Sequence, residues 1–184
     1  YFNKGFSDVF LINVKDKIDQ LQEVIYELTK GYLVDHDNTI EISERLNLAF
    51  KKIPDDKLWS NIMNQVNQSK ELNNLINDKE IIKAFKSIFK EPKRFPISFF
   101  RARFPGQRRV VYDWHQDEGT WYLNNDSNIT KKFPTTLWFS VNGSNQNNSM
   151  QLIEKSHNKL YEHNCVEGQG YFKAIFDHTK IQDS

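Results

Sequence analysis

The stretch PISFFRARF, residues 96–104, is the point where the hydrophobic pattern of this chain changes its period. A strand over this stretch would have two different faces, with Ile97, Phe99, Arg101 and Arg103 on one and Ser98, Phe100, Ala102 and Phe104 on the other. Such alternation is typical of a β-strand, because successive side chains point to opposite faces. Helical spacing comes before this stretch and strand-like segments follow it. The order predicts an α+β domain or a β-sandwich decorated with helices.

Three helices are predicted before about residue 93. The first is indicated by apolar residues that recur every three or four positions: Ile18, Leu21, Ile25 and Leu28. Asn13 is its candidate N-cap, and Gly31 is the residue that would end it. A second helix is expected after Pro54, and a third from Asp78 to a point before Pro92.

Four further segments after residue 104 read as short strands: RVVYDWHQD (109–117), TTLWFSV (135–141), SMQLIE (149–154) and YFKAIF (171–176). No linker rich in Pro, Gly or Ser separates the helical and strand-like parts. We therefore expect one domain over residues 1–184, helical to about residue 93 and sheet-forming from about residue 94.

Composition narrows the classes of partner. The net charge is +1, which provides no general field for nucleic acid or an anionic membrane surface, and no apolar run is long enough to cross a bilayer. Cys165 is the single cysteine, so no internal disulfide forms and a reducing, cytoplasmic location is expected. A small-molecule substrate is the expected partner, and the oligomeric state is left open.

The segment DWHQDEGTW, residues 113–121, contains a candidate metal pair. On a strand, His115 and Asp117 would point the same way and offer one nitrogen and one oxygen donor. That donor set suits Fe(II) or another divalent first-row metal, and an iron site of the two-His-one-carboxylate kind needs one more histidine. Asp113 is also two residues from His115 and competes for the same role. Alone, the pair also fits two ordinary strand residues.

Several segments, taken in order, resemble the phytanoyl-CoA dioxygenase family of Fe(II)- and 2-oxoglutarate-dependent oxygenases. They are GFSDVFLIN (5–13), RFPG (103–106), WHQD (114–117), LWFSV (137–141) and NNSMQLIEKSH (147–157). The last is similar to the family segment N-G-x-L-x-x-x-P-G-S-H, with Asn147, Met150, Ser156 and His157 in register. Asn148 replaces the family glycine, and Glu154-Lys155 replaces Pro-Gly.

The resemblance implies a double-stranded β-helix, a cupin-like jelly roll, with the N-terminal helices packed outside. It implies that His115 and Asp117 bind iron and that the enzyme hydroxylates a small molecule, with 2-oxoglutarate as cosubstrate and release of succinate and CO₂. Trp138 matches a tryptophan that lines the 2-oxoglutarate pocket, and Trp121 matches an aromatic residue of the substrate pocket. Core packing explains either tryptophan equally well.

Residues on the predicted strand 96–104 also enter the site hypothesis. If that face points inward, Arg101 binds the cosubstrate, and Arg103 and Phe99 contact the substrate. If it points outward, the two arginines form a solvated stripe.

The family's second iron-binding histidine, and the arginine that pairs with 2-oxoglutarate, follow the S-H segment at a distance. We expect this histidine beyond Ser184, in a longer native protein that also supplies the last strands of the jelly roll. His178 is the alternative third ligand within this sequence. A second hypothesis keeps the jelly roll as a non-catalytic module that binds a ligand or partner without a complete iron triad.

Overall fold

A computed structural model of the 184-residue chain describes part of its residues. They are residues 12–32, 40–52, 56–92, 99–102, 104, 114–117, 135–159, 161–166 and 171–174. Their contacts divide the chain into two compact units. We call the first the helical unit, with described residues inside 10–106 and 139–144, and the second the site unit, with described residues inside 107–138 and 145–184. That the chain is a single domain stays a prediction.

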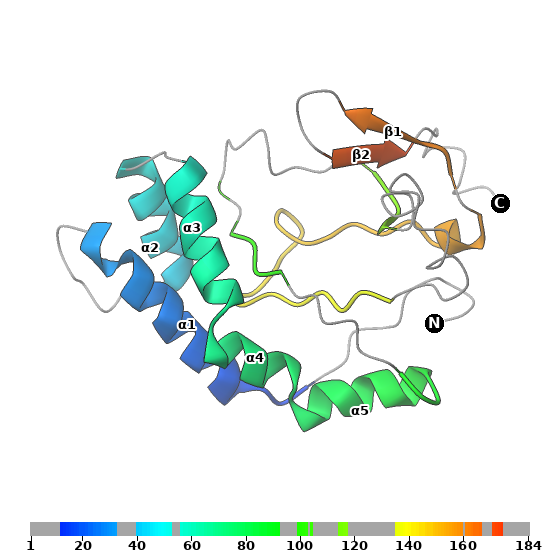
Figure 1. The fold of residues 1–184 in the computed structure, drawn as a ribbon, viewed down its shortest axis with the longest axis horizontal. Helices are drawn as coiled ribbons and strands as arrows, with labels where there is room; N and C mark the ends of the chain where they lie inside the picture. Colours follow the sequence, from blue (N-terminus) through cyan, green and yellow to red (C-terminus); the bar gives the residue numbers. More distant parts are fainter. Residues whose placement is uncertain are drawn as a thin grey trace. The chain divides into compact units, whose positions relative to one another are not determined.

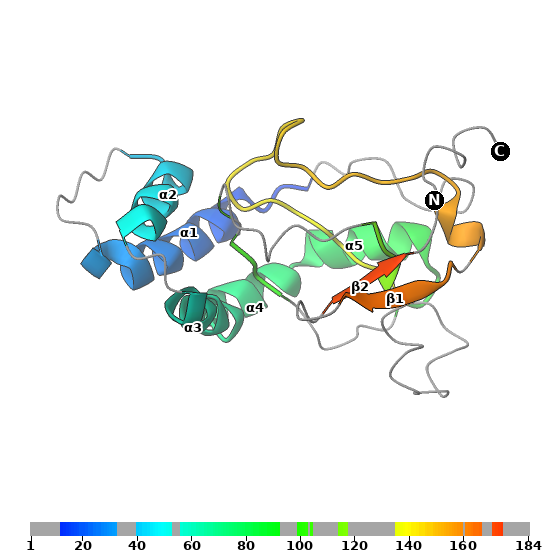
Figure 2. The same cartoon turned by 90° about the horizontal axis from the view of Figure 1, so that it is seen from above.

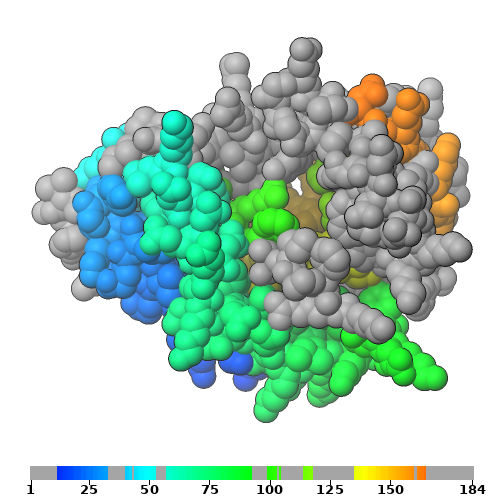
Figure 3. All heavy atoms as spheres, viewed as in Figure 1, coloured from blue at the N-terminus to red at the C-terminus, as the bar shows by residue number. Residues whose placement is uncertain are grey.

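The described residues of the helical unit form five α-helices (Figure 1). They are α1 (Lys15–Thr29), α2 (Ile42–Lys52), α3 (Asp56–Asn67), α4 (Lys70–Ile76) and α5 (Lys79–Ile88). Helix α1 contacts α2, α3 and α4, and the turned view shows α4 running on from α3 (Figure 2). Figure 3 shows α1 and α3 side by side on one face of this unit. None of the described helices has the length and apolar character needed to cross a membrane.

The three predicted helices are confirmed as α1, α3 and α5, and their ends show which capping predictions hold. The Asp78 side chain accepts a hydrogen bond from the Glu80 N–H at 2.7 Å, so α5 begins where the sequence predicted. The Asn13 cap is wrong, because Val14 occupies the N-cap of α1 and makes no side-chain cap bond. Gly31 does not directly end α1, because it lies in a 3₁₀ turn, η1 (Lys30–Tyr32), that follows Thr29.

Aromatic packing forms part of the core of the helical unit. Trp59 of α3 is 2% exposed, and its ring lies 4.7 Å from that of Phe104. Phe50 of α2 stacks on Phe104 with ring centroids 4.3 Å apart, and its ring lies 6.0 Å from that of Trp59. Ala49 and Ile62 complete the buried cluster. Phe104 thus brings the segment that contains it into contact with α2 and α3.

Residues 99–102 and 104 are not a β-strand, which corrects the first strand prediction. The side chain of Asn67 at the end of α3 accepts from the Phe100 N–H and donates to the Phe100 carbonyl, and the Ala102 N–H donates to the sulfur of Met63 at 3.3 Å. Side chains of α3 therefore take the backbone groups that a neighbouring strand would need. The predicted alternation is kept, since Phe104 is buried while Phe99 is 67% exposed.

The jelly-roll prediction, and with it the α+β or mainly β fold class, is wrong for the described part of the chain. The described residues form five α-helices and one antiparallel pair of strands, β1 (His163–Val166) and β2 (Tyr171–Ala174). His163 lies opposite Ala174 in this pair. The strand predicted at 171–176 is confirmed over β2, whereas 135–141 and 149–154 form none.

Hydrogen bonds from side chains, both distant and local in sequence, account for the missing strands. The Val141 carbonyl accepts from the side chain of Gln22 in α1 at 2.8 Å. The Asn145 side chain accepts from the Asn147 N–H at 2.8 Å, and the Asn148 side chain accepts from the Asn145 N–H at 2.6 Å. Asparagine side chains that bond nearby backbone favour turns over a ladder of strand pairs. The chain therefore turns at 145–149 instead of leading into a strand.

Candidate functional site

His115 and Asp117 lie close together, although the described segment 114–117 is not a strand. The His115 Nε2 atom is 3.6 Å from the Asp117 Oδ1 atom. The side chain of His115 is 33% exposed and that of Asp117 is 57% exposed, so solvent reaches both groups. The alternation argument for this pair was wrong for the described residues, but the juxtaposition it predicted is present.

The second oxygen of Asp117 has its own partner. The hydroxyl of Thr136 donates a hydrogen bond to Asp117 Oδ2 at 2.8 Å. The two oxygens of the carboxylate therefore face different partners: Oδ1 faces His115 and Oδ2 faces Thr136.

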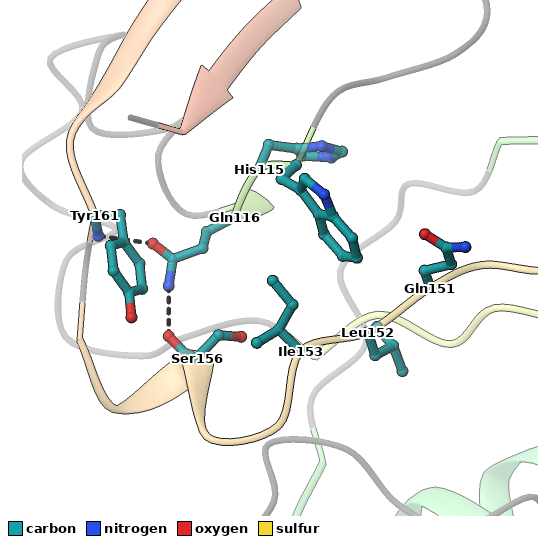
Figure 4. A pocket seen from close by; sticks show the side chains of 8 residues that line it. His115, Gln116, Gln151, Leu152, Ile153, Ser156 and Tyr161 are labelled. Atoms are coloured by element: carbon teal, nitrogen blue, oxygen red, sulfur yellow. Dashed lines mark hydrogen bonds between the residues drawn. The ribbon is translucent and has the colours of Figure 1, made fainter. Parts of the chain in front are cut away.

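Gln116, between the two candidate ligands, ties their segment to residues 156–161. Its side-chain amide donates to the carbonyls of Ser156 and Lys159, both at 2.8 Å. Its side-chain oxygen accepts from the Tyr161 N–H, also at 2.8 Å. In Figure 4 the Gln116 side chain points toward Tyr161 and Ser156, while that of His115 leaves the chain in a different direction. A two-donor, one-acceptor side chain used in this way fixes the backbone that carries His115 and Asp117.

His163 supports the same segment and is not a third metal ligand. This residue is buried at the start of β1. Its Nε2 atom accepts from the Gln116 N–H at 2.9 Å, and its Nδ1 atom lies 2.7 Å from the Tyr161 carbonyl. Since the backbone N–H must donate, the hydrogen-bond pattern assigns the ring proton to Nδ1. Both ring nitrogens are thus engaged by the backbone.

A small pocket of about 70 Å³ lies beside His115 (Figure 4). The described residues that line it are Trp114, His115, Gln116, Gln151, Leu152, Ile153, Ser156 and Tyr161. None of these is Asp, Glu, Lys or Arg, so apart from the imidazole the described lining is neutral. Sites for whole ligands usually enclose about 300–1,000 Å³, and this pocket therefore admits a small neutral group.

The distance between the candidate ligands fits one shared metal ion. Two donors about 2.1 Å from an ion lie about 3.0 Å apart at a right angle and about 4.2 Å apart when opposite. The 3.6 Å between His115 Nε2 and Asp117 Oδ1 lies between these limits, about 0.6 Å wider than the spacing of adjacent ligands in a six-coordinate site. Among the described residues, no group of three or more His, Cys, Asp or Glu side chains gathers as a complete site. Asp113 and His178 lie outside the described residues.

The other predicted site residues are distributed over both units. Phe99 and Arg101 belong to the helical unit, and the Arg101 guanidinium lies 5.2 Å from the centre of the Phe99 ring. Trp138 belongs to the site unit and is 47% exposed, which argues against the core-packing alternative. Arg103 and Trp121 lie outside the described residues. The cosubstrate and substrate roles of these residues stay predictions.

Thr136 and His163 were not assigned these contacts from the sequence. Thr136 is 19 residues from Asp117, and Gln116 is 47 residues from His163, so no local pattern joins them. Gln116 offered a partial signal in the sequence, because it lies between the two candidate ligands.

Comparisons of this chain with family models, with curated proteins and with solved structures found no match. The resemblance to the phytanoyl-CoA dioxygenase family therefore rests on the motifs quoted above, and the chemistry rests on the contacts of His115 and Asp117.

Proposed function

We propose that this protein is an Fe(II)- and 2-oxoglutarate-dependent oxygenase that hydroxylates a small molecule. The observation that carries the proposal is the 3.6 Å approach of His115 Nε2 to Asp117 Oδ1. The motif WHQD at 114–117 and the ordered segments around it support iron over other first-row metals, because they resemble the phytanoyl-CoA dioxygenase family.

In this proposal the residues of the chain bind the metal ion and hold its ligands in position. His115 supplies a neutral nitrogen donor, Asp117 supplies an oxygen donor and one negative charge, and Gln116 holds the backbone between them. When bound, iron, 2-oxoglutarate and dioxygen would supply the oxidising chemistry, in which one oxygen atom of dioxygen enters the substrate C–H bond and the other enters succinate as CO₂ is released. The neutral pocket beside His115 accepts a small uncharged group of substrate or cosubstrate.

A site of this kind also has a third protein ligand, which we expect outside the described residues. His178 is one candidate in this sequence. Trp138 and Arg101 are the proposed cosubstrate contacts, and Phe99, Arg103 and Trp121 are the proposed substrate contacts.

The test is an anaerobic titration of the whole protein with Fe(II) and 2-oxoglutarate. A weak visible charge-transfer band should develop, and both His115→Ala and Asp117→Ala should abolish it. His157→Ala and Glu154→Ala are matched controls, because they remove an exposed histidine and an exposed carboxylate from the same unit. Both controls should keep the band, and Asp113→Ala should keep it too if Asp117 is the ligand.

Two outcomes would contradict the proposal. A band that survives both His115→Ala and Asp117→Ala would show that these side chains do not hold the iron. Absence of any band in the unmodified protein, with circular dichroism showing an intact fold, would favour a non-catalytic binding role. If the band is present, a screen for succinate release over candidate substrate classes would identify the substrate.

A further inference from the structure

We propose that Thr136 is a positioning residue that makes Asp117 a metal ligand through one oxygen only, an inference that rests on the proposed function. The Thr136 hydroxyl donates to Asp117 Oδ2 at 2.8 Å, while Oδ1 faces His115 Nε2 at 3.6 Å. One carboxylate oxygen is thus directed toward the metal position and the other is held by the hydroxyl.

The hydrogen bond is well suited to this task. A hydroxyl that donates to an ionised carboxylate forms a stronger bond than one between neutral groups. Threonine is branched at Cβ, so its hydroxyl has few rotamers and is placed before any metal arrives. Packing contributes little to holding a side chain that is 57% exposed, as that of Asp117 is. The orientation of this carboxylate therefore depends strongly on polar contacts.

One-oxygen binding matters for the number of open coordination positions. A two-His-one-carboxylate site in which each ligand uses one position leaves three of six positions open. In the proposed reaction, these three positions would accept a chelating oxoacid and dioxygen. If Asp117 bound through both oxygens, one of the three would be lost. By holding Oδ2, Thr136 keeps three coordination positions open, which is the number that the proposed reaction requires.

The experiment measures metal affinity without turnover. Co(II) is titrated into the whole protein, and its dissociation constant is compared between variants. Thr136→Val keeps the shape and removes the hydroxyl, and it should weaken Co(II) binding about 10–100-fold, the usual effect of losing a partner that orients a metal ligand. Thr136→Ser restores a hydroxyl and should bring the affinity back to within a few-fold of the unmodified protein. Thr135→Val is the matched control and should leave the affinity unchanged.

The outcomes separate this inference from the proposed function. If Asp117→Ala does not weaken Co(II) binding, the metal assignment itself fails. If Asp117→Ala weakens it and Thr136→Val does not, the metal assignment stands and the role of Thr136 is refuted. Failure of Thr136→Ser to bind Co(II) nearly as tightly as the unmodified protein would also refute it, because a hydroxyl at this position would then not be enough to hold Asp117 Oδ2. Thr136→Ala repeats the measurement should Thr136→Val fail to fold.

Discussion

Trp59 in the helical unit is 2% exposed, whereas Trp138 in the site unit is 47% exposed. Trp59 packs against the rings of Phe50 and Phe104, in a cluster where three helices and an extended segment supply side chains. Tryptophan is thus part of the hydrophobic core in one unit and part of the surface in the other. Burial of an aromatic ring stabilises a fold, while an exposed ring remains available for contact with a ligand.

The two units also use hydrogen bonds differently. Helices dominate the described part of the helical unit, and side chains cap the N-termini of α4 and α5. In the described part of the site unit, one side chain, that of Gln116, links residues 116, 156, 159 and 161. Packing therefore orders the first unit, and polar contacts to the backbone order the second. The three predictions below test this difference, beginning with the largest effect.

Truncation of Trp59 should destabilise the helical unit strongly. Trp59→Ala removes a buried ring and leaves a cavity beside Phe50 and Phe104, at a cost of about 3–5 kcal/mol in the free energy of unfolding. Urea denaturation followed by the helical circular dichroism signal measures this loss. Leu48→Ala, at a position of α2 that is 36% exposed, is the control and should cost much less. Equal losses for the two variants would mean that the aromatic cluster does not dominate the stability of this unit.

Replacement of Gln116 should loosen the site unit with little effect on the helices. Gln116→Leu removes three side-chain hydrogen bonds and should cost about 1–2 kcal/mol locally. The Tyr161 amide then loses its acceptor, so hydrogen exchange at residues 159–164 should accelerate about tenfold, the factor that corresponds to 1.4 kcal/mol. Gln151→Leu, in the lining of the same pocket, should leave this exchange unchanged. Equally fast exchange in both variants would refute the anchoring role.

The helices were predictable because their signals are local. Asp78 caps α5 from the residue just before it, and the apolar spacing of α1 lies within a few turns. Helix α4 was missed although Ser69 caps it, since seven residues offer too short a pattern. Helix α2 was also missed, although Leu46, Ala49 and Phe50 have helical spacing.

Apart from the one confirmed over β2, the strand predictions failed in the described residues because strand formation depends on partners far along the chain. Residues 99–104 alternate as a strand does, but Asn67 and Met63 of α3 take their backbone groups. The candidate site shows the same division. The proximity of His115 to Asp117 was expected from their spacing of two positions in the sequence, whereas the Thr136 contact joins residues that no spacing rule connects. Residues two apart approached each other without the strand that the prediction assumed.

The smallest predicted effect is a change in stability at low pH. It tests whether an ion pair adds to the stability that packing gives the helical unit. Lys17 of α1 forms an ion pair with Asp78, and this hydrogen bond, followed by that from the Glu80 N–H, lowers the pKa of Asp78 below its ordinary value of 3.8. A carboxyl whose pKa is lower in the folded state stabilises the fold above its ordinary pKa. That contribution is lost as the pH falls through the lowered value.

Asp78→Asn should therefore make the helical unit less sensitive to acid. Asparagine caps helices about as well as aspartate, so the variant removes the charge but keeps the start of α5. Thermal unfolding near neutral pH and below about pH 3 measures the effect. The midpoint of the unmodified protein should fall more between the two conditions than that of Asp78→Asn. Lys17→Met should reduce the difference in the same direction, because it removes the largest cause of the lowered pKa. Identical acid sensitivity in all three proteins would mean that the link between α1 and α5 contributes no net stability, leaving packing as the dominant source of order in this unit.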